Sequence, residues 1–127
     1  MIPEEPFVRL LPTQACDMVP SAVRWAQAVH TALKAVPRQE MLRPARESLS
    51  AVTWVLAAAA DFEDRIPPAF TAEVLAREAG VGARVWQKRT AWLREHGWLE
   101  HAGAHAWSGW QLRSPGVEHP QPGTRPA

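Results

Sequence analysis

The stretch that decides the fold is TAEVLAREAGVGARVWQKRTAWLREHGWL, residues 71–99. Thr71 is a good helix N-cap, and the short helix that it opens is expected to end at Gly80, because glycine readily takes the left-handed conformation of a C-cap. A brief turn then leads into a second helix, predicted over Ala83 to His96, which Gly97 terminates. The stretch therefore predicts two consecutive helices joined by a tight glycine turn.

The residues after this stretch predict a β-hairpin followed by a disordered end. Trp98 to His101 and Trp107 to Arg113 are two short strand candidates on either side of a loop region, Gly103 to Gly109. From Ser114 to Ala127 the chain holds four prolines, two glycines and little that is apolar. Residues 114–127 are therefore expected to be a disordered tail.

A long alanine-rich helix is predicted before the deciding stretch. Pro44 stands at a favourable first helical position, and the helix is expected over Ala45 to about Phe62. Apolar residues occupy both of its faces, which predicts the most buried helix of the fold. They are Leu49, Val52, Leu56 and Ala59 on one face and Trp54, Val55 and Ala58 on the other. The next segment, Arg65 to Phe70, contains two adjacent prolines and is expected to be a loop.

A further amphipathic helix is predicted nearer the start of the chain. Ser21 is a plausible N-cap, and the helix is expected over Ser21 to Val36, where Pro37 ends it. Its apolar stripe consists of Ala22, Ala26, Val29, Leu33 and Val36. Trp25 lies beside this stripe and widens it into a packing surface. Residues 1–20 hold four prolines and are expected to form an arm, extended over Phe7 to Leu11.

Length and composition indicate one globular domain. The chain has 127 residues, of which 46% are hydrophobic and 21% charged, so the composition is not that of a wholly disordered protein. Cys16 is the single cysteine, which excludes an intrachain disulfide and an all-cysteine zinc site. The longest apolar run, Ala51 to Ala60, is about half of a membrane span. These features predict a cytoplasmic protein without a membrane partner.

The order of elements, together with a set of residues at matching positions, resembles the winged helix-turn-helix superfamily over Pro44 to Arg113. The residues that carry the resemblance are Thr71, Leu75, Ala76, Gly80, Val81, Trp86, Leu93, Gly97, Trp98 and Leu99. The resemblance implies a mainly α fold with a small β-hairpin, here with an extra N-terminal helix. The expected layout is an arm over 1–20, a helix and link over 21–43, the winged domain over 44–113 and the tail.

A narrower likeness concerns function. The alanine-rich helix, the proline-containing loop and the Arg-Glu-His-Gly-Trp-Leu ending look like DNA-binding domains of actinobacterial phage, plasmid and regulator proteins. The resemblance implies a nucleoid-associated regulator of transcription that binds duplex DNA, or a phage or plasmid replication or maintenance factor. The chain departs from the usual pattern at Gly82, where a Ser or Thr N-cap is common, and in a hairpin that lacks the arginines of a groove-entering wing.

Helical geometry assigns the faces of the second helix of the pair. At 100° per residue, Trp86, Thr90, Leu93 and Gly97 point toward the core. The opposite face carries Arg84, Gln87, Lys88, Ala91 and Glu95, with Arg94 at its edge. Arg or Lys suits guanine and Gln suits adenine in the major groove, so the expected base contacts are Arg84, Gln87 and Lys88. The expected DNA-backbone contacts are Thr71, Arg77, Arg89, Arg94, His105 and Arg113.

Charge and aromatic residues suggest how many copies bind. Residues 1–64 carry a net charge of −2 and residues 65–127 a net charge of +3, so a single copy has little attraction for DNA. Trp92 lies on a flank of its helix with Val85, Arg89 and His96, and something must cover it. The expected interface residues are Trp25 and Trp92, covered by the helix over 21–36 or by a second copy. A homodimer is therefore predicted.

Three alternatives were weighed against DNA binding. His96, His101 and His105, with His119 or Cys16, have spacings that allow a metal sensor site, although no metal and no cofactor are expected. No nucleophile with a base, carboxylate pair or phosphate-cradling loop is evident, so the chain is not expected to be an enzyme. The main competitor is a winged helix that binds a protein partner through the hairpin, with Trp107 and Trp110, or through the tail.

Overall fold

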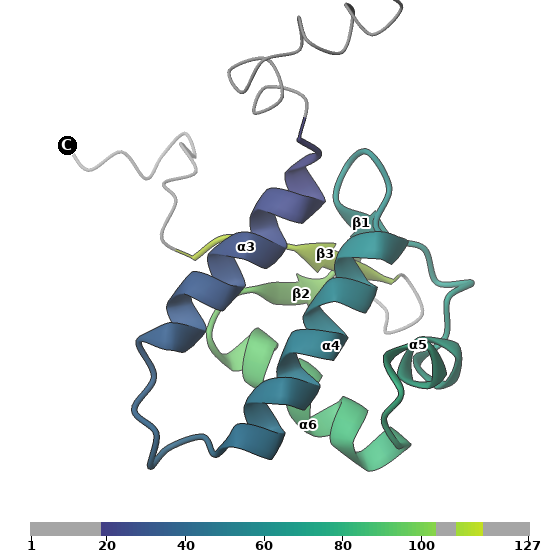
Figure 1. Cartoon of the computed structure of the whole chain (residues 1–127). Helices are drawn as coiled ribbons and strands as arrows, with labels where there is room; N and C mark the ends of the chain where they lie inside the picture. Colours follow the sequence, from purple (N-terminus) through teal and green to yellow (C-terminus); the bar gives the residue numbers. More distant parts are fainter. Residues whose placement is uncertain (1–18, 104–108, 116–127) are drawn as a thin grey trace, which may run out of the picture.

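The computed structural model describes residues 19–103 and 109–115. The predictions for the arm, for Cys16, His105, Trp107 and His119, and for the tail from residue 116 lie outside these residues. The elements in chain order are α3 (Ser21–Lys34), α4 (Arg43–Ala59), β1 (Arg65–Ile66), α5 (Ala72–Ala79), α6 (Ala83–Glu95), β2 (Leu99–His101) and β3 (Trp110–Leu112). Figure 1 shows α3 and α4 side by side, with the strands and α6 behind them and α5 beside α4.

The described part of the chain is mainly α, with four helices and a three-stranded antiparallel sheet, an arrangement consistent with a winged-helix-like fold. The sheet has the order β1-β3-β2. The predicted hairpin is confirmed, since Leu99 of β2 pairs with Leu112 of β3. None of the helices in the described ranges is long and apolar enough to cross a membrane.

The prediction that Arg65 to Phe70 is only a loop was wrong at its first two residues. Arg65 and Ile66 form β1, which pairs antiparallel with Gln111 and Trp110 of β3. The two prolines that suggested a loop follow this strand and end it, because proline has no backbone N–H for a ladder. The strand exists through pairing with residues more than 40 positions away, which a local pattern does not reveal.

The extra helix α3 is anchored to the sheet through one tryptophan. The predicted stripe is buried at Ala22, Ala26, Val29 and Leu33, and Trp25 joins it with 4% of its surface exposed. The indole N–H of Trp25 donates to the backbone oxygens of Trp98, at 3.0 Å, and Arg113, at 2.8 Å. The helix begins at Ser21, with Pro20 as its N-cap, so the prediction of a Ser21 cap was wrong.

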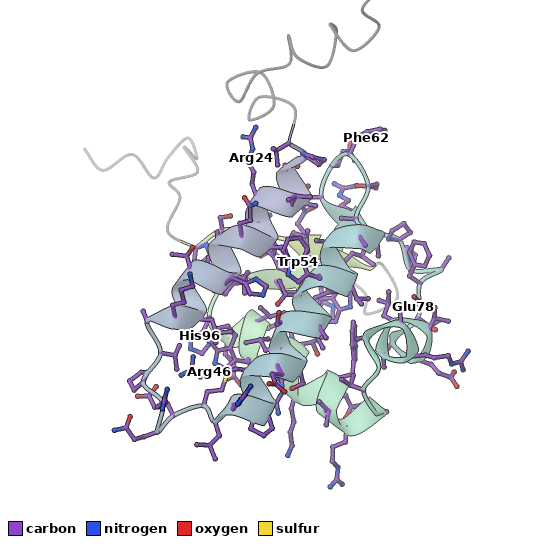
Figure 2. The ribbon with its side chains drawn as sticks, in the orientation of Figure 1. Arg24, Arg46, Trp54, Phe62, Glu78 and His96 are labelled. Atoms are coloured by element: carbon purple, nitrogen blue, oxygen red, sulfur yellow. The ribbon has the colours of Figure 1, made fainter. Side chains whose placement is uncertain are left out.

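The alanine-rich helix α4 is central, yet it keeps a solvent-facing side. Leu49, Val52 and Leu56 are fully buried, as predicted. The prediction that both faces are buried was wrong, because Trp54 is 41% exposed and Ala58 is also exposed. Figure 2 shows Trp54 between α3 and α4, where its ring meets the His30 ring at 5.6 Å. A helix packed on several neighbours still leaves the sector between them open to solvent.

Candidate nucleic-acid interface

The helix pair that opens the candidate site is held by its predicted caps. The Thr71 hydroxyl accepts a hydrogen bond from the Val74 backbone N–H at 3.2 Å, which starts α5. Gly80 takes the left-handed conformation, with φ of +75°, and ends the helix. The backbone N–H of Val81 then donates to the Ala76 oxygen at 3.0 Å, which closes the turn. These contacts fix the direction in which α6 leaves α5.

The turn presents α6 with its predicted inner face against the core. Trp86, Thr90 and Leu93 are buried, and the Thr90 hydroxyl donates to the Trp86 carbonyl one turn earlier at 3.0 Å. That bond satisfies the buried hydroxyl inside the helix itself. Gly97, which was expected on the same stripe, is exposed and has φ of +83°, so it turns the chain into β2.

The outer face of α6 carries the three residues expected to touch bases. Arg84, Gln87 and Lys88 are all exposed. Their exposure follows from the inward position of Trp86 and Leu93, because residues one or two positions along a helix lie about 100° or 200° apart around its axis. Two cations and one amide therefore project from the first two turns of α6, which we call the α6 face.

The other cations predicted to bind phosphate lie in different surroundings. Arg89 is half-buried, and its Nε donates to the Ser48 hydroxyl of α4 at 2.8 Å. Arg94 is exposed, with its guanidinium 5.8 Å from the centre of the Trp110 ring in β3. Arg77 lies 4.0 Å from Glu73 on the surface of α5. Arg89 thus joins α6 to α4, whereas Arg94 and Arg77 stay on the surface.

Arg113 is placed least favourably for a DNA contact. Its guanidinium pairs with the Glu100 carboxylate at 2.6 Å, so its charge is already compensated. It follows β3 directly, and its backbone oxygen accepts the Trp25 indole N–H. Arg113 therefore lies at the base of the hairpin, away from the loop that joins β2 to β3, and we leave it out of the candidate site.

The two tryptophans named as interface residues occupy different positions. Trp25 is in the core, so the surface it completes lies within the chain and is not offered to a second copy. Trp92 is half-buried, and its ring stacks on the His96 ring with centroids 4.0 Å apart. The Nδ1 of His96 lies 2.8 Å from the Trp92 carbonyl, which holds the two rings together. The residue that covers part of Trp92 is therefore a neighbour on its own helix.

The histidines proposed as a metal site are separated by these contacts. His101 stacks on Trp110 with ring centroids 4.5 Å apart, while His96 stacks on Trp92. Within residues 19–103 and 109–115, no group of three His, Cys, Asp or Glu side chains is placed to hold a metal ion. His101 and His96 instead cover tryptophan faces on the hairpin and on α6.

Sequence analysis missed a second cationic region, in the link between α3 and α4. The structure gathers Lys34, Arg38, Arg43 and Arg46 around an open hollow there. The signal was present in the sequence as four cations within residues 34–46, with Glu40 as the single acid between Lys34 and Arg46. The resemblance to the winged helix-turn-helix superfamily begins at Pro44, so it gives no expectation for Lys34, Arg38 or Arg43.

Comparisons with protein-family models, with curated proteins and with solved structures give no match to this chain.

Proposed function

We propose that this chain is a winged helix-turn-helix protein that binds duplex DNA and inserts α6 into the major groove. The observation that carries the proposal is the α6 face, on which Arg84, Gln87 and Lys88 are exposed directly after the Gly80 turn. One helix fits the major groove, and recognition helices touch base edges with residues near their N-terminal end.

The chemistry of the α6 face matches base recognition. The arginine and lysine can each donate to guanine, and Gln87 can pair its amide with adenine. Ala91 lies one turn further along the same side and is small, so the helix can approach the base edges closely. The half-buried Arg89 is bound to Ser48 and fixes the tilt of α6 on α4, which is a positioning role.

Phosphate contacts would flank this face. Thr71 stands at the exposed start of α5, and Arg77 is on the same helix, where its contact with Glu73 is long and solvent-exposed. Such exposed pairs contribute little, so Arg77 can exchange its partner for a phosphate. Arg94 supplies a second flanking cation, at the far end of α6. Because few cations are available per copy, a homodimer that doubles them is part of the proposal.

The experiment compares two double variants that each remove two positive charges. Arg84→Ala with Lys88→Ala changes the α6 face, and Arg24→Ala with Arg65→Ala is the matched control at the opposite end of the molecule, where Figure 2 labels Arg24. The probe is a duplex selected by the intact protein from a random pool. We expect the α6 variant to lose roughly 30-fold or more in affinity, since each base contact is worth about 1–3 kcal/mol, and the control to lose far less.

Three further readouts test the proposal on the same samples. Affinity of the intact protein should fall steeply as salt rises, because phosphate binding releases counterions. Gln87→Ala should relax selection at one base position without abolishing binding. If two copies bind, the selected consensus should be palindromic. Sedimentation of the complex measures the number of bound copies independently. Binding that is undetectable or insensitive to salt would remove the proposal.

A protein-binding role is the second candidate, and exposed apolar side chains favour it. Phe62 is fully exposed at the end of the turn after α4, and Phe70 and Val74 are 44% and 41% exposed near the start of α5. Phe62 lies at the opposite end of the molecule from the start of α6 (Figure 2), so a protein partner at Phe62 is compatible with DNA binding. Replacement of Phe62 by serine should leave duplex affinity unchanged, whereas the Arg84 and Lys88 substitutions should lower it by roughly 30-fold or more.

A further inference from the structure

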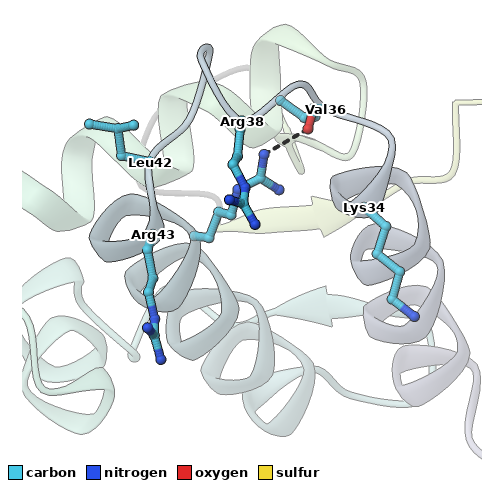
Figure 3. A pocket seen from close by; sticks show the side chains of 6 residues that line it. Lys34, Val36, Arg38, Leu42 and Arg43 are labelled. Atoms are coloured by element: carbon cyan, nitrogen blue, oxygen red, sulfur yellow. Dashed lines mark hydrogen bonds between the residues drawn. The ribbon is translucent and has the colours of Figure 1, made fainter.

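The link between α3 and α4 forms a hollow whose lining is strongly cationic. Figure 3 shows this link hollow from close by. Its lining residues are Lys34, Val36, Arg38, Leu42, Arg43 and Arg46, four of them cationic and none acidic. Lys34, Arg38 and Arg43 are exposed, so their head groups are available to an anion. Arg46 is half-buried and lies against the link itself.

Arg46 gives the link hollow a fixed shape. Its guanidinium donates to the backbone oxygens of Leu33, Val36 and Met41 at 2.9, 2.6 and 2.8 Å, and to that of Pro37 at 3.2 Å. The contact with Val36 is the dashed line in Figure 3. Because these acceptors are neutral carbonyls, the bonds order the link without cancelling the positive charge. The three exposed cations are therefore attached to a braced stretch of backbone.

The acidic residues near the hollow compensate only part of this charge. Arg43 pairs with Glu47 at 3.0 Å, but both side chains are largely exposed, at 87% and 67%, so the pair is weak. Glu40 is the one acid in residues 35–42 and is exposed. Four positive and two negative charges leave a positive surface in a half of the chain whose overall charge is negative.

The link hollow lies at the same end of the molecule as the start of α6. Figure 1 shows the link, the first turn of α4 and the first turn of α6 along the lower edge. The Arg89 to Ser48 hydrogen bond joins α6 to α4 five residues after Arg43, which is about 7.5 Å along the helix axis. The α6 face and the α4 side of the link hollow, which carries Arg43 and Arg46, therefore lie on two helices that are bonded to each other. Arg46 in turn ties α4 to the end of α3 and to the link.

We propose that the link hollow binds the phosphate backbone of the same DNA duplex that α6 enters. This inference rests on the proposed function and assigns the extra helix a role in it. The hollow is open and the side chains of Lys34, Arg38 and Arg43 are exposed, which suits a polyanion with repeating phosphates. Lys34 and Arg38 would be the contacting residues, and Arg46 would be a positioning residue.

The test is the salt dependence of duplex affinity for Lys34→Gln with Arg38→Gln. Both residues are exposed, and glutamine keeps their polarity, so circular dichroism should show an unchanged fold. The control is Arg24→Gln with Arg65→Gln, which removes the same charge from the opposite end. We expect the slope of log affinity against log salt to fall by roughly one unit or more, since each phosphate contact contributes about 0.9. The loss should be equal on selected and unrelated duplexes.

The outcomes separate this inference from the function on which it rests. An intact protein that does not bind duplex overturns both proposals. Normal binding with a slope that is equal in the link variant and the wild type overturns only the link hollow. A separate experiment titrates inorganic phosphate against the intact protein and follows the amide NMR shifts. Tight saturable binding of inorganic phosphate at residues 34–46, with an unchanged duplex slope, would assign the hollow to a free phosphate and would also overturn it.

Discussion

Replacement of Trp25 by phenylalanine tests how the extra helix is attached to the sheet. The substitution keeps an aromatic ring in the buried position but removes the indole N–H, which donates to the oxygens of Trp98 and Arg113. The Trp98 oxygen keeps the backbone N–H of Arg113 as a donor at 3.0 Å. The Arg113 oxygen, which follows β3 and is partly buried by this contact, loses the indole N–H as its donor.

The expected cost follows from these contacts. A lost hydrogen bond costs about 1 kcal/mol, and an acceptor left without a good partner adds roughly 0.5–1 kcal/mol at a partly buried site. The phenyl ring is smaller than the indole and leaves a small cavity in the core, worth about another 1 kcal/mol. Trp25→Phe should therefore lower the free energy of unfolding by about 2–3 kcal/mol.

Urea unfolding followed by far-ultraviolet circular dichroism measures this change. With a slope of about 1.5 kcal/mol/M for a chain of this size, the midpoint should move down by roughly 1.3–2 M. Trp54→Phe is the matched control, because Trp54 is 41% exposed and should cost under about 1 kcal/mol. Equal midpoints for the two variants would refute the role given to the Trp25 indole.

Four other substitutions probe single features. Thr53→Val should raise the free energy of unfolding by roughly 1 kcal/mol, because the buried Thr53 hydroxyl has no hydrogen-bond partner among the described residues. Gly109→Ala should lower it by about 2–4 kcal/mol, since φ is +96° and a Cβ would overlap the Ile66 carbonyl oxygen; a wild-type midpoint would contradict this. Gly82→Ser should gain about 0.5–1 kcal/mol by capping α6, because no described atom lies within 4 Å of the new Cβ. For Asp61, the Arg65 backbone N–H bonded to its carboxylate holds the pKa below the ordinary value. Its contribution is present above the ordinary pKa and is lost as pH falls through the lower one, so Asp61→Asn should flatten the fall of the urea midpoint between pH 5 and 3.

The helices were predictable because the residues at or next to their ends indicate where they stop. Gly80 and Gly97 stop α5 and α6 with positive φ, as a glycine at those points indicates. The features that were predicted wrongly depend on contacts with residues that are distant in the sequence. Strand β1 needs β3 to exist, and the exposure of Trp54 depends on which sectors of α4 its neighbours leave open. Neither can be derived from periodicity within one segment.

In the candidate site, too, some features follow from the sequence of one helix and others depend on packing between elements. The exposure of Arg84 and Lys88 followed from the angular position of the core residues on one helix. The pairing of Arg89 with Ser48 and of Arg113 with Glu100 depends on helix packing and strand register, so both cations were expected to be available. The link hollow was missed because its cations approach one another only when α3 and α4 lie side by side.

The contact between Trp25 and Arg113 also bears on the order of synthesis. A chain emerging from the ribosome exposes α3 early, but the acceptor for its indole N–H lies 88 residues later. Until residue 113 has left the exit tunnel, the indole of Trp25 lacks its Arg113 carbonyl partner and the core stays incomplete. A stop codon placed between α6 and β3 would therefore release a product prone to degradation, although all four described helices would be fully translated.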